Sequence, residues 1–165
     1  MYFYKNFLEK LDIRLKEYAT KQKEHIFCSR GCCYCCEKGD YPLSQLELEY
    51  IMFGYSTLDL PTKRILQENF SNIQKGGVCP FLINKECSIY PYRPIVCRVH
   101  GLVYLCKENL VKVPFCVNLG LNFSKVYKDG YVMIDPIKEN LDTPSVLNNL
   151  DFGEIRNLYD WLYNK

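Results

Sequence analysis

The sequence predicts a small single-domain, cysteine-rich metal-binding fold that is mainly α-helical with short β-hairpins. Three observations predict it: helical spacing of apolar residues, turn residues between short apolar segments, and ten cysteines in 165 residues. A chain of this length suits one domain, so residues 1–165 are expected to form a single cysteine-cluster metal-binding domain. An apolar fraction of 48% supplies enough side chains for a packed core.

Two longer helices are expected in the first half of the chain. Residues 3–24 place apolar side chains on one face and Lys and Glu on the other. A second helix is expected from about residue 60 to residue 75, with Pro61 in its first turn and Gly76-Gly77 after its end. A cysteine-dense loop, Cys28–Pro42, follows the first helix.

A capping box marks a shorter helix between these two. Ser44 and Glu47 stand three residues apart, the spacing at which each side chain accepts a hydrogen bond from the other residue's backbone N–H. We expect this helix to run from Ser44 to about Phe53, because Gly54 lies where a C-terminal cap would fall.

Two hairpins are expected in the middle of the chain, close to cysteines. Cys79–Ile83 and Cys87–Tyr90 are typical of short strands, and the polar residues 84–86 between them are typical of a turn. Leu102–Leu105 and Leu110–Val113 are expected to pair in the same way.

The remaining elements are expected to be short. Pro91–Gly101 indicates a tight turn and a helical turn carrying Cys97 and His100, and Tyr131–Ile134 indicates a strand. A final helix is expected to be capped by Asp151. One face of this helix would be apolar, made of Ile155, Leu158, Trp161 and Leu162.

The N-terminal segment and the lack of long apolar stretches indicate a cytoplasmic protein. Charged residues such as Lys5 and Glu9 interrupt the first apolar residues, so no signal peptide is expected. No segment approaches the ~18 apolar residues of a membrane span. The formal net charge of +2 gives no electrostatic reason to bind nucleic acid or an anionic membrane, so neither is expected as a partner, and a protein is the one kind of partner that we consider.

The clustering of the cysteines indicates metal ligands. Five cysteines lie between Cys28 and Cys36, where neighbouring thiols are too close in sequence to pair as unstrained disulfides. Disulfides also seldom persist in the cytosol. Thiolates this close together repel one another unless a cation holds them, and a metal supplies that charge. A second segment, Cys79–Cys97, contributes three further cysteines after helices that can fold back on the first.

Recognisable motifs surround these cysteines. They are the loop Cys28–Cys36, Cys79-Pro80-Phe81-Leu82, Cys87-Ser88-Ile89-Tyr90, Arg93-Pro94-Ile95-Val96-Cys97-Arg98 and, more weakly, His100-Gly101 and Cys116 with Asn122-Phe123. In these motifs the chain resembles the CxxCxxCC cysteine-cluster family, described as a zinc- or iron-chelating domain, of which flagellin lysine N-methylase is a larger relative. The resemblance covers about residues 28–123. The family name implies two residues between the first two cysteines, whereas Cys28 and Cys32 have three between them, so the ligand is either Cys28 or the additional Cys33.

The resemblance implies metal chelation by family-matching thiols. These are Cys28, Cys32, Cys35, Cys36, Cys79, Cys87, Cys97 and Cys116. Eight thiols suit two zinc sites of four ligands each, or an iron–sulfur cluster on four thiolates with the others free for a second cluster or for structure. We favour an iron–sulfur cluster of the 4Fe-4S type over zinc, because nearly all candidate ligands are cysteines and histidine is scarce.

Three other side chains near the cysteines have two interpretations each. His100 follows Cys97 at Cys-x2-His spacing and is either a metal ligand or, in the interpretation we prefer, a neighbour that hydrogen-bonds a thiolate. Arg93 and Arg98 either act on the anionic thiolates or an acidic partner, or form ordinary salt bridges. Cys106, isolated from the clusters, is expected to be a simple buried thiol.

Three functions follow as hypotheses. The first is a metal-binding protein with a cysteine-ligated centre, with iron–sulfur favoured, in a redox, metal-handling or protein-modification accessory role. The second is a structural zinc module whose surface binds a protein partner. The third, by analogy with the methylase relative, is an enzyme of protein lysine methylation or its component, although the chain carries no recognisable S-adenosylmethionine loop.

Overall fold

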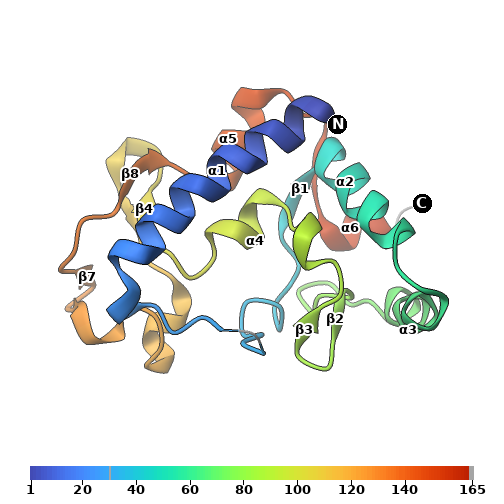
Figure 1. Ribbon diagram of the computed structural model, residues 1–165, viewed down its shortest axis with the longest axis horizontal. Helices are drawn as coiled ribbons and strands as arrows, with labels where there is room; N and C mark the ends of the chain where they lie inside the picture. The colour runs from blue at the N-terminus through green and yellow to red at the C-terminus, as the bar shows by residue number, and fades with distance from the viewer. Residues whose placement is uncertain (30, 164–165) are drawn as a thin grey trace.

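The computed structural model describes residues 1–29 and 31–163 (Figure 1). Helices dominate, and the strands are short, so the predicted fold class is confirmed. The α-helices are α1 (Tyr2–Lys21), α2 (Gln45–Ser56), α3 (Leu60–Ser71), α4 (Ile95–Val99), α5 (Thr143–Leu150) and α6 (Leu158–Tyr163). The strands are β1 (Pro42–Ser44), β2 (Leu82–Ile83), β3 (Glu86–Cys87), β4 (Tyr104–Leu105), β5 (Val111–Lys112), β6 (Tyr127–Lys128), β7 (Tyr131–Val132), β8 (Ile137–Asn140) and β9 (Ile155–Asn157).

The first predicted helix is confirmed as α1, which buries one apolar stripe. Tyr4, Leu8, Leu11 and Leu15 recur at intervals of three and four and are all buried. A short 3-10 turn, Lys23–His25, continues the chain toward the cysteine loop. The expected helical span of 3–24 therefore ends as α-helix at Lys21.

The capping box that predicts α2 is present. The Ser44 hydroxyl accepts a hydrogen bond from the Glu47 backbone N–H, and the Glu47 carboxylate accepts one from the Ser44 backbone N–H. Glu47 is fully buried and also accepts hydrogen bonds from the Tyr4 hydroxyl and the Ile95 backbone N–H, so the cap ties α1, α2 and α4 together. The predicted end at Gly54 is wrong. Gly54 lies inside the helix, where the Tyr92 ring packs so closely that a β-carbon would lie 2.5 Å from it.

The third helix begins as predicted and ends earlier. The Asp59 carboxylate caps the backbone N–H of Thr62, and Pro61 lies in the first turn of α3. The helix ends at Ser71 rather than near residue 75, and Asn72 closes it by donating its side-chain N–H to the Glu68 carbonyl. Asparagine suits a helix end because its side chain competes for backbone partners.

Both predicted hairpins are present in shortened form. β2 pairs with β3 around Asn84 and Lys85, which both have positive φ, as a two-residue hairpin turn requires. β4 pairs with β5. The predicted strand at 131–134 is β7, and it pairs with β6 across the Asp129-Gly130 turn.

The C-terminal prediction needs a correction. Asp151 does not cap the final helix. It has a left-handed φ of 48° and ends α5, a helix that was not expected from the sequence. Ile155 then lies in β9, and the final helix, α6, begins only at Leu158.

Two strand pairings join distant parts of the chain. β1 pairs antiparallel with β9, and β8 pairs parallel with β4 to form a three-stranded sheet with β5. These pairings hold the C-terminal quarter of the chain against the cysteine-bearing half. Among the described residues, no helix combines the length and the apolar character needed to span a membrane.

Helix α4 lies between two apolar cores and in this way fixes Cys97. Ile95 and Val99 belong to the core built around α1, which lies against α4 (Figure 1). Val96 belongs to the second core, with residues of α2, α3 and the β2–β3 hairpin. Because its neighbours on α4 are packed into the two cores, Cys97 is held at the edge of a cavity.

Candidate metal centre

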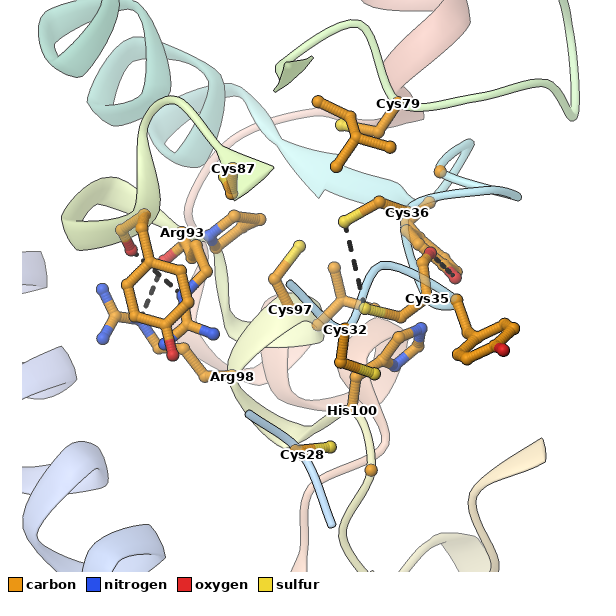
Figure 2. A pocket seen from close by; sticks show the side chains of 18 of the residues that line it. Cys28, Cys32, Cys35, Cys36, Cys79, Cys87, Arg93, Cys97, Arg98 and His100 are labelled. Atoms are coloured by element: carbon orange, nitrogen blue, oxygen red, sulfur yellow. Dashed lines mark hydrogen bonds between the residues drawn. The ribbon is translucent and has the colours of Figure 1, made fainter. Parts of the chain in front are cut away.

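A cavity of about 1020 Å³ brings together the predicted ligands. Eight thiols line it: Cys28, Cys32, Cys35, Cys36, Cys79, Cys87, Cys97 and Cys116. They come from the loop after α1, the β2–β3 hairpin, α4 and the 3-10 turn Phe115–Leu119. We refer to this space as the cysteine cavity. Figure 2 shows Cys35 and Cys36 turned toward each other, with the Cys97 sulfur directed into the same space.

The two other cysteines stand apart from the cysteine cavity. The Cys33 thiol is 3.7 Å from a carboxylate oxygen of Glu37, and the Cys106 thiol donates a hydrogen bond to the Leu110 carbonyl at 3.1 Å. Neither residue lines the cavity, whereas Cys28 does. The geometry therefore favours Cys28 over Cys33 as the candidate ligand. All ten cysteines are free thiols.

Backbone amides point at the two hairpin thiols. The Phe81 N–H is directed at the Cys79 sulfur, and the Ile89 N–H at the Cys87 sulfur, two residues along in each case. Burial raises the pKa of Cys79 to about 12 and also raises that of Cys87, and each amide opposes the increase. An amide so placed favours the thiolate, the form that binds metal.

Cys35 and Cys36 form a close pair of sulfurs. Their sulfurs are 3.9 Å apart. The hydrogen bond from Cys36 lowers the pKa of Cys35 to about 7 and raises the pKa of Cys36. The Tyr41 hydroxyl donates to the Cys35 carbonyl at 2.6 Å and anchors this part of the loop. Cys35 is thus the thiol in this pair that ionises near neutral pH.

Asn122 holds Cys28 at the opposite part of the cavity. This asparagine is 1% exposed, and its side-chain N–H groups donate to the Cys28 sulfur at 2.9 Å and to the Gly101 carbonyl at 2.8 Å. Its carbonyl oxygen accepts from the Phe27 backbone N–H at 2.7 Å. Burial raises the pKa of Cys28 to about 11, and the hydrogen bond from Asn122 opposes that increase.

The two arginines have different roles. Arg98 holds α4 to α1 and to the segment that precedes α4. Its guanidinium pairs with Asp12 on α1 and also donates to the Arg93 and Pro91 carbonyls. Arg93 lines the cysteine cavity, with its guanidinium stacked 3.5 Å from the centre of the Tyr90 ring. Of the two sequence interpretations, the structure supports action on the thiolates for Arg93, which lowers the pKa values of Cys35, Cys87 and Cys97 against the burial that raises those of the last two.

His100 also lines the cavity and has an unsatisfied nitrogen. Its Nε2 atom is buried and finds no hydrogen-bond partner among the residues that the structure describes. The ring packs edge-on against Tyr41 at 4.6 Å, and burial lowers its pKa to about 4. A neutral imidazole with a free nitrogen suits either a metal or a thiolate hydrogen bond.

The donor set fits a metal centre chemically. Within residues 1–29 and 31–163, no three His, Cys, Asp or Glu side chains already converge as a group that would hold an ion. The thiols instead surround a volume, and soft sulfur donors of this kind select zinc, copper(I) or iron–sulfur clusters. The unsatisfied Nε2 of His100 and the amides aimed at sulfur are further groups that a bound metal centre would use.

Sequence reasoning does not find two of the residues that shape this site. Gly39 lies in the predicted cysteine-dense loop and belongs to no motif, yet a β-carbon there would lie 2.7 Å from the Cys79 Cα, so the cysteine loop touches the second cysteine segment at this point. Tyr41 carries no motif, because its role depends on contacts with Cys35 and His100 that only the fold creates.

The fold and the site define a small cysteine-cluster protein that binds metal. The chain matches the CxxCxxCC family model, described as "Putative zinc- or iron-chelating domain", over residues 27–117. This match covers more than half of the chain, and the protein belongs to that family. Comparison with curated proteins gives no match, and neither does comparison with solved structures.

Proposed function

We propose that this protein holds an iron–sulfur cluster of the 4Fe-4S type on thiolates of the cysteine cavity, in a redox, metal-handling or protein-modification accessory role. The observation that carries the proposal is the convergence of eight thiols from four elements on one cavity of about 1020 Å³. Iron–sulfur clusters take four thiolates. When bound, such a cluster supplies one-electron chemistry.

The surroundings of the thiols support this proposal. Tyr41, Phe81 and Phe115 line the cavity beside them and limit the access of water. Solvent exposure and hydrogen bonds to the sulfurs set the potential of a cluster. The chain supplies such bonds from the backbone amides of Phe81 and Ile89 and from the side chain of Asn122.

Free thiols also suggest where the protein works. Ten unpaired cysteines persist in a reducing compartment and are oxidised elsewhere. We therefore propose a cytoplasmic location.

A structural zinc module is the second candidate, and one distance favours it. Zinc–sulfur bonds of about 2.3 Å in a tetrahedron separate the sulfurs by roughly 3.8 Å. The Cys35 and Cys36 sulfurs are 3.9 Å apart, so sulfurs in this cavity approach each other as closely as zinc ligands do. In this role the metal would replace part of the core, and the outer surface would serve a protein partner.

The deciding measurement is the content of iron, zinc and acid-labile sulfide per chain, with the visible spectrum, in protein purified without oxygen. Iron with matching sulfide and a broad visible absorption is the expected result. Zinc without sulfide would favour the structural zinc module over the iron–sulfur cluster. A chain that takes up neither metal would overturn both candidates.

Three variants test the ligand assignment. Cys35→Ser and Cys97→Ser are each expected to lose about half of the bound metal or more, because each removes a thiol that lines the cavity. Cys106→Ser is the matched control, since this thiol bonds to the Leu110 carbonyl outside the cavity. Equal metal content in all three variants would contradict the assignment.

A further inference from the structure

We propose that the cysteine cavity holds two separate metal centres, each on four thiols that the fold gathers by a different set of contacts. The first set, the hairpin group, is Cys36, Cys79, Cys87 and Cys97. The second set, the loop group, is Cys28, Cys32, Cys35 and Cys116. This inference rests on the proposed metal binding and specifies how the ligands divide.

Backbone hydrogen bonds bring the first members of the hairpin group together. The Cys79 N–H donates to the Cys36 carbonyl at 2.7 Å, and the Gly39 N–H donates to the Gly77 carbonyl at 2.9 Å. The end of the cysteine loop is therefore fastened alongside the second cysteine segment. Cys36 and Cys79 are fixed next to each other although they are 43 positions apart in the sequence.

The β2–β3 hairpin and α4 complete this group. Cys87 pairs with Leu82, whose N–H donates to the Cys79 carbonyl, so Cys79 and Cys87 are carried by one hairpin. Cys97 lies on α4, and its thiol lines the cavity together with those of Cys79 and Cys87. In Figure 2, Cys36, Cys79, Cys87 and Cys97 surround the same part of the cavity.

Different contacts gather the loop group. Asn122 binds the Cys28 sulfur through its side chain, and its own backbone N–H is directed at the Cys116 sulfur. The neighbouring Phe123 N–H donates to the His25 carbonyl at 2.7 Å and holds the two segments together. One residue thus brings together thiols that are 88 positions apart.

Cys32 and Cys35 belong with these two thiols. The Cys32 N–H donates to the Ser29 carbonyl at 3.0 Å, which fastens Cys32 to the residue next to Cys28. Cys35 follows three residues later in the same loop. Figure 2 shows Cys32 on the side of the cavity toward Cys28 and His100, away from Cys79.

Cys35 lies at the boundary between the groups. Its sulfur is 3.9 Å from that of Cys36, which is a member of the hairpin group. The hairpin group already has four thiols without Cys35, and a four-coordinate centre takes no fifth. The loop group needs Cys35 to reach four. The two centres therefore adjoin at the Cys35–Cys36 peptide.

The test counts metal in variants that each damage one group. We expect Cys97→Ser and Cys28→Ser each to retain about half of the iron and sulfide, or of the zinc, found in the wild type. The double variant is expected to retain almost none. Cys87→Ser and Cys32→Ser should repeat the two half-losses, which checks that each effect belongs to a group and not to one side chain.

The outcomes separate this inference from the proposed function. A wild type without metal would overturn the proposed function itself. A wild type with one centre that is lost completely in either single variant would leave the proposed function intact and overturn the division into two groups. Single variants with undiminished metal would also overturn it.

A titration of the wild type covers the case in which the variants do not fold. Cobalt(II) is added to reduced, metal-free protein, and the thiolate-to-cobalt absorption is followed. Saturation at two equivalents per chain is expected. Saturation at one equivalent would contradict the inference.

Discussion

At the scale of single residues, Asn122 has the most specific relation to the site. Every polar group of its buried side chain is occupied: the oxygen by the Phe27 N–H, and the nitrogen by the Gly101 carbonyl and the Cys28 sulfur. Gly101 must be glycine here, because its φ is +81° and a β-carbon would lie 2.9 Å from the Cys28 sulfur. Asn122 is therefore a positioning residue for Cys28.

Replacing the amide by a carboxylate tests this role. In Asn122→Asp, the donor to the Cys28 sulfur is lost and a negative charge faces the thiolate, so metal affinity is expected to fall about 10–100-fold. Competition with a chelator measures this change. The pH dependence of Cys28 alkylation should move to higher pH, which a purely structural role would not produce.

Asn72→Asp is the matched control, because this asparagine caps α3 by bonding to the Glu68 carbonyl on an exposed surface. It should leave metal affinity unchanged. An Asn122→Asp variant with wild-type affinity and an unmoved alkylation profile would contradict the positioning role.

The sequence predicts the candidate ligands better than it predicts their surroundings. Close cysteine spacing reveals the thiols, since few other structures need them so near together. Spacing cannot separate Cys28 from Cys33, because both lie in a loop whose side-chain directions depend on Asn122 and Glu37. The free nitrogen of His100 is likewise a property of the packed fold.

At the scale of elements, the close contact between the cysteine loop and the second cysteine segment is the feature that most directly shapes the cavity. Gly39 makes it possible, since a β-carbon there would lie 2.7 Å from the Cys79 Cα and 2.8 Å from its backbone nitrogen. Backbone atoms cannot move aside as a flexible side chain can. Any larger residue at this position must separate the two segments.

Gly39→Ala is therefore expected to weaken metal binding as well as the fold. Overpacking of this kind costs about 1–3 kcal/mol of unfolding free energy. Because Cys36 and Cys79 move apart, metal content should fall even at temperatures where the protein stays folded. Chemical denaturation and metal analysis of the same samples measure the two effects.

Gly130→Ala is the control that separates the loss of stability from the loss of bound metal. Gly130 has a φ of +88° in the β6–β7 turn, with no atoms near its added β-carbon, so alanine there strains the backbone without entering the cavity. It should lower stability and keep the metal. Loss of metal in proportion to stability in both variants would argue against a specific role for Gly39.

Elements with local signals are predicted well, and those fixed by distant contacts are not. The Ser44–Glu47 capping box identifies α2, and Pro61 identifies the first turn of α3, because each signal is local. The β1–β9 and β4–β8 pairings are missed, since their partners are brought together only by the packed fold. Asp151 satisfies the spacing of a helix start, yet its left-handed backbone ends α5 instead.

At the scale of the whole molecule, burial of the thiols couples metal binding to pH. Burial raises the pKa of Cys28 to about 11 and that of Cys79 to about 12, from an ordinary value of 9.0. Both thiols are protonated in the metal-free fold at neutral pH, and both must lose that proton to bind metal. The contribution of these two thiols to the stability of the metal-free fold is full below pH 9, and it is lost as the pH rises toward 11 and 12.

Metal uptake at neutral pH should therefore release about one proton for each protonated thiol that becomes a ligand, and affinity should rise with pH. Calorimetric titration with zinc in buffers of different ionisation heat counts these protons. Cys79→Ser should release fewer protons per chain than the wild type, and Cys106→Ser should match the wild type. Affinity that does not change between pH 6 and pH 8 would contradict the protonated state of the thiols.

The division of ligands between early and late parts of the chain has a consequence for biosynthesis. The last thiol of the hairpin group is Cys97, whereas the loop group waits for Cys116 and for Asn122, which holds Cys28. A chain emerging from the ribosome exposes one complete set of ligands while the other still lacks a member. On the two-centre assignment, the order of translation sets the order of loading, and the first centre can form on a nascent chain.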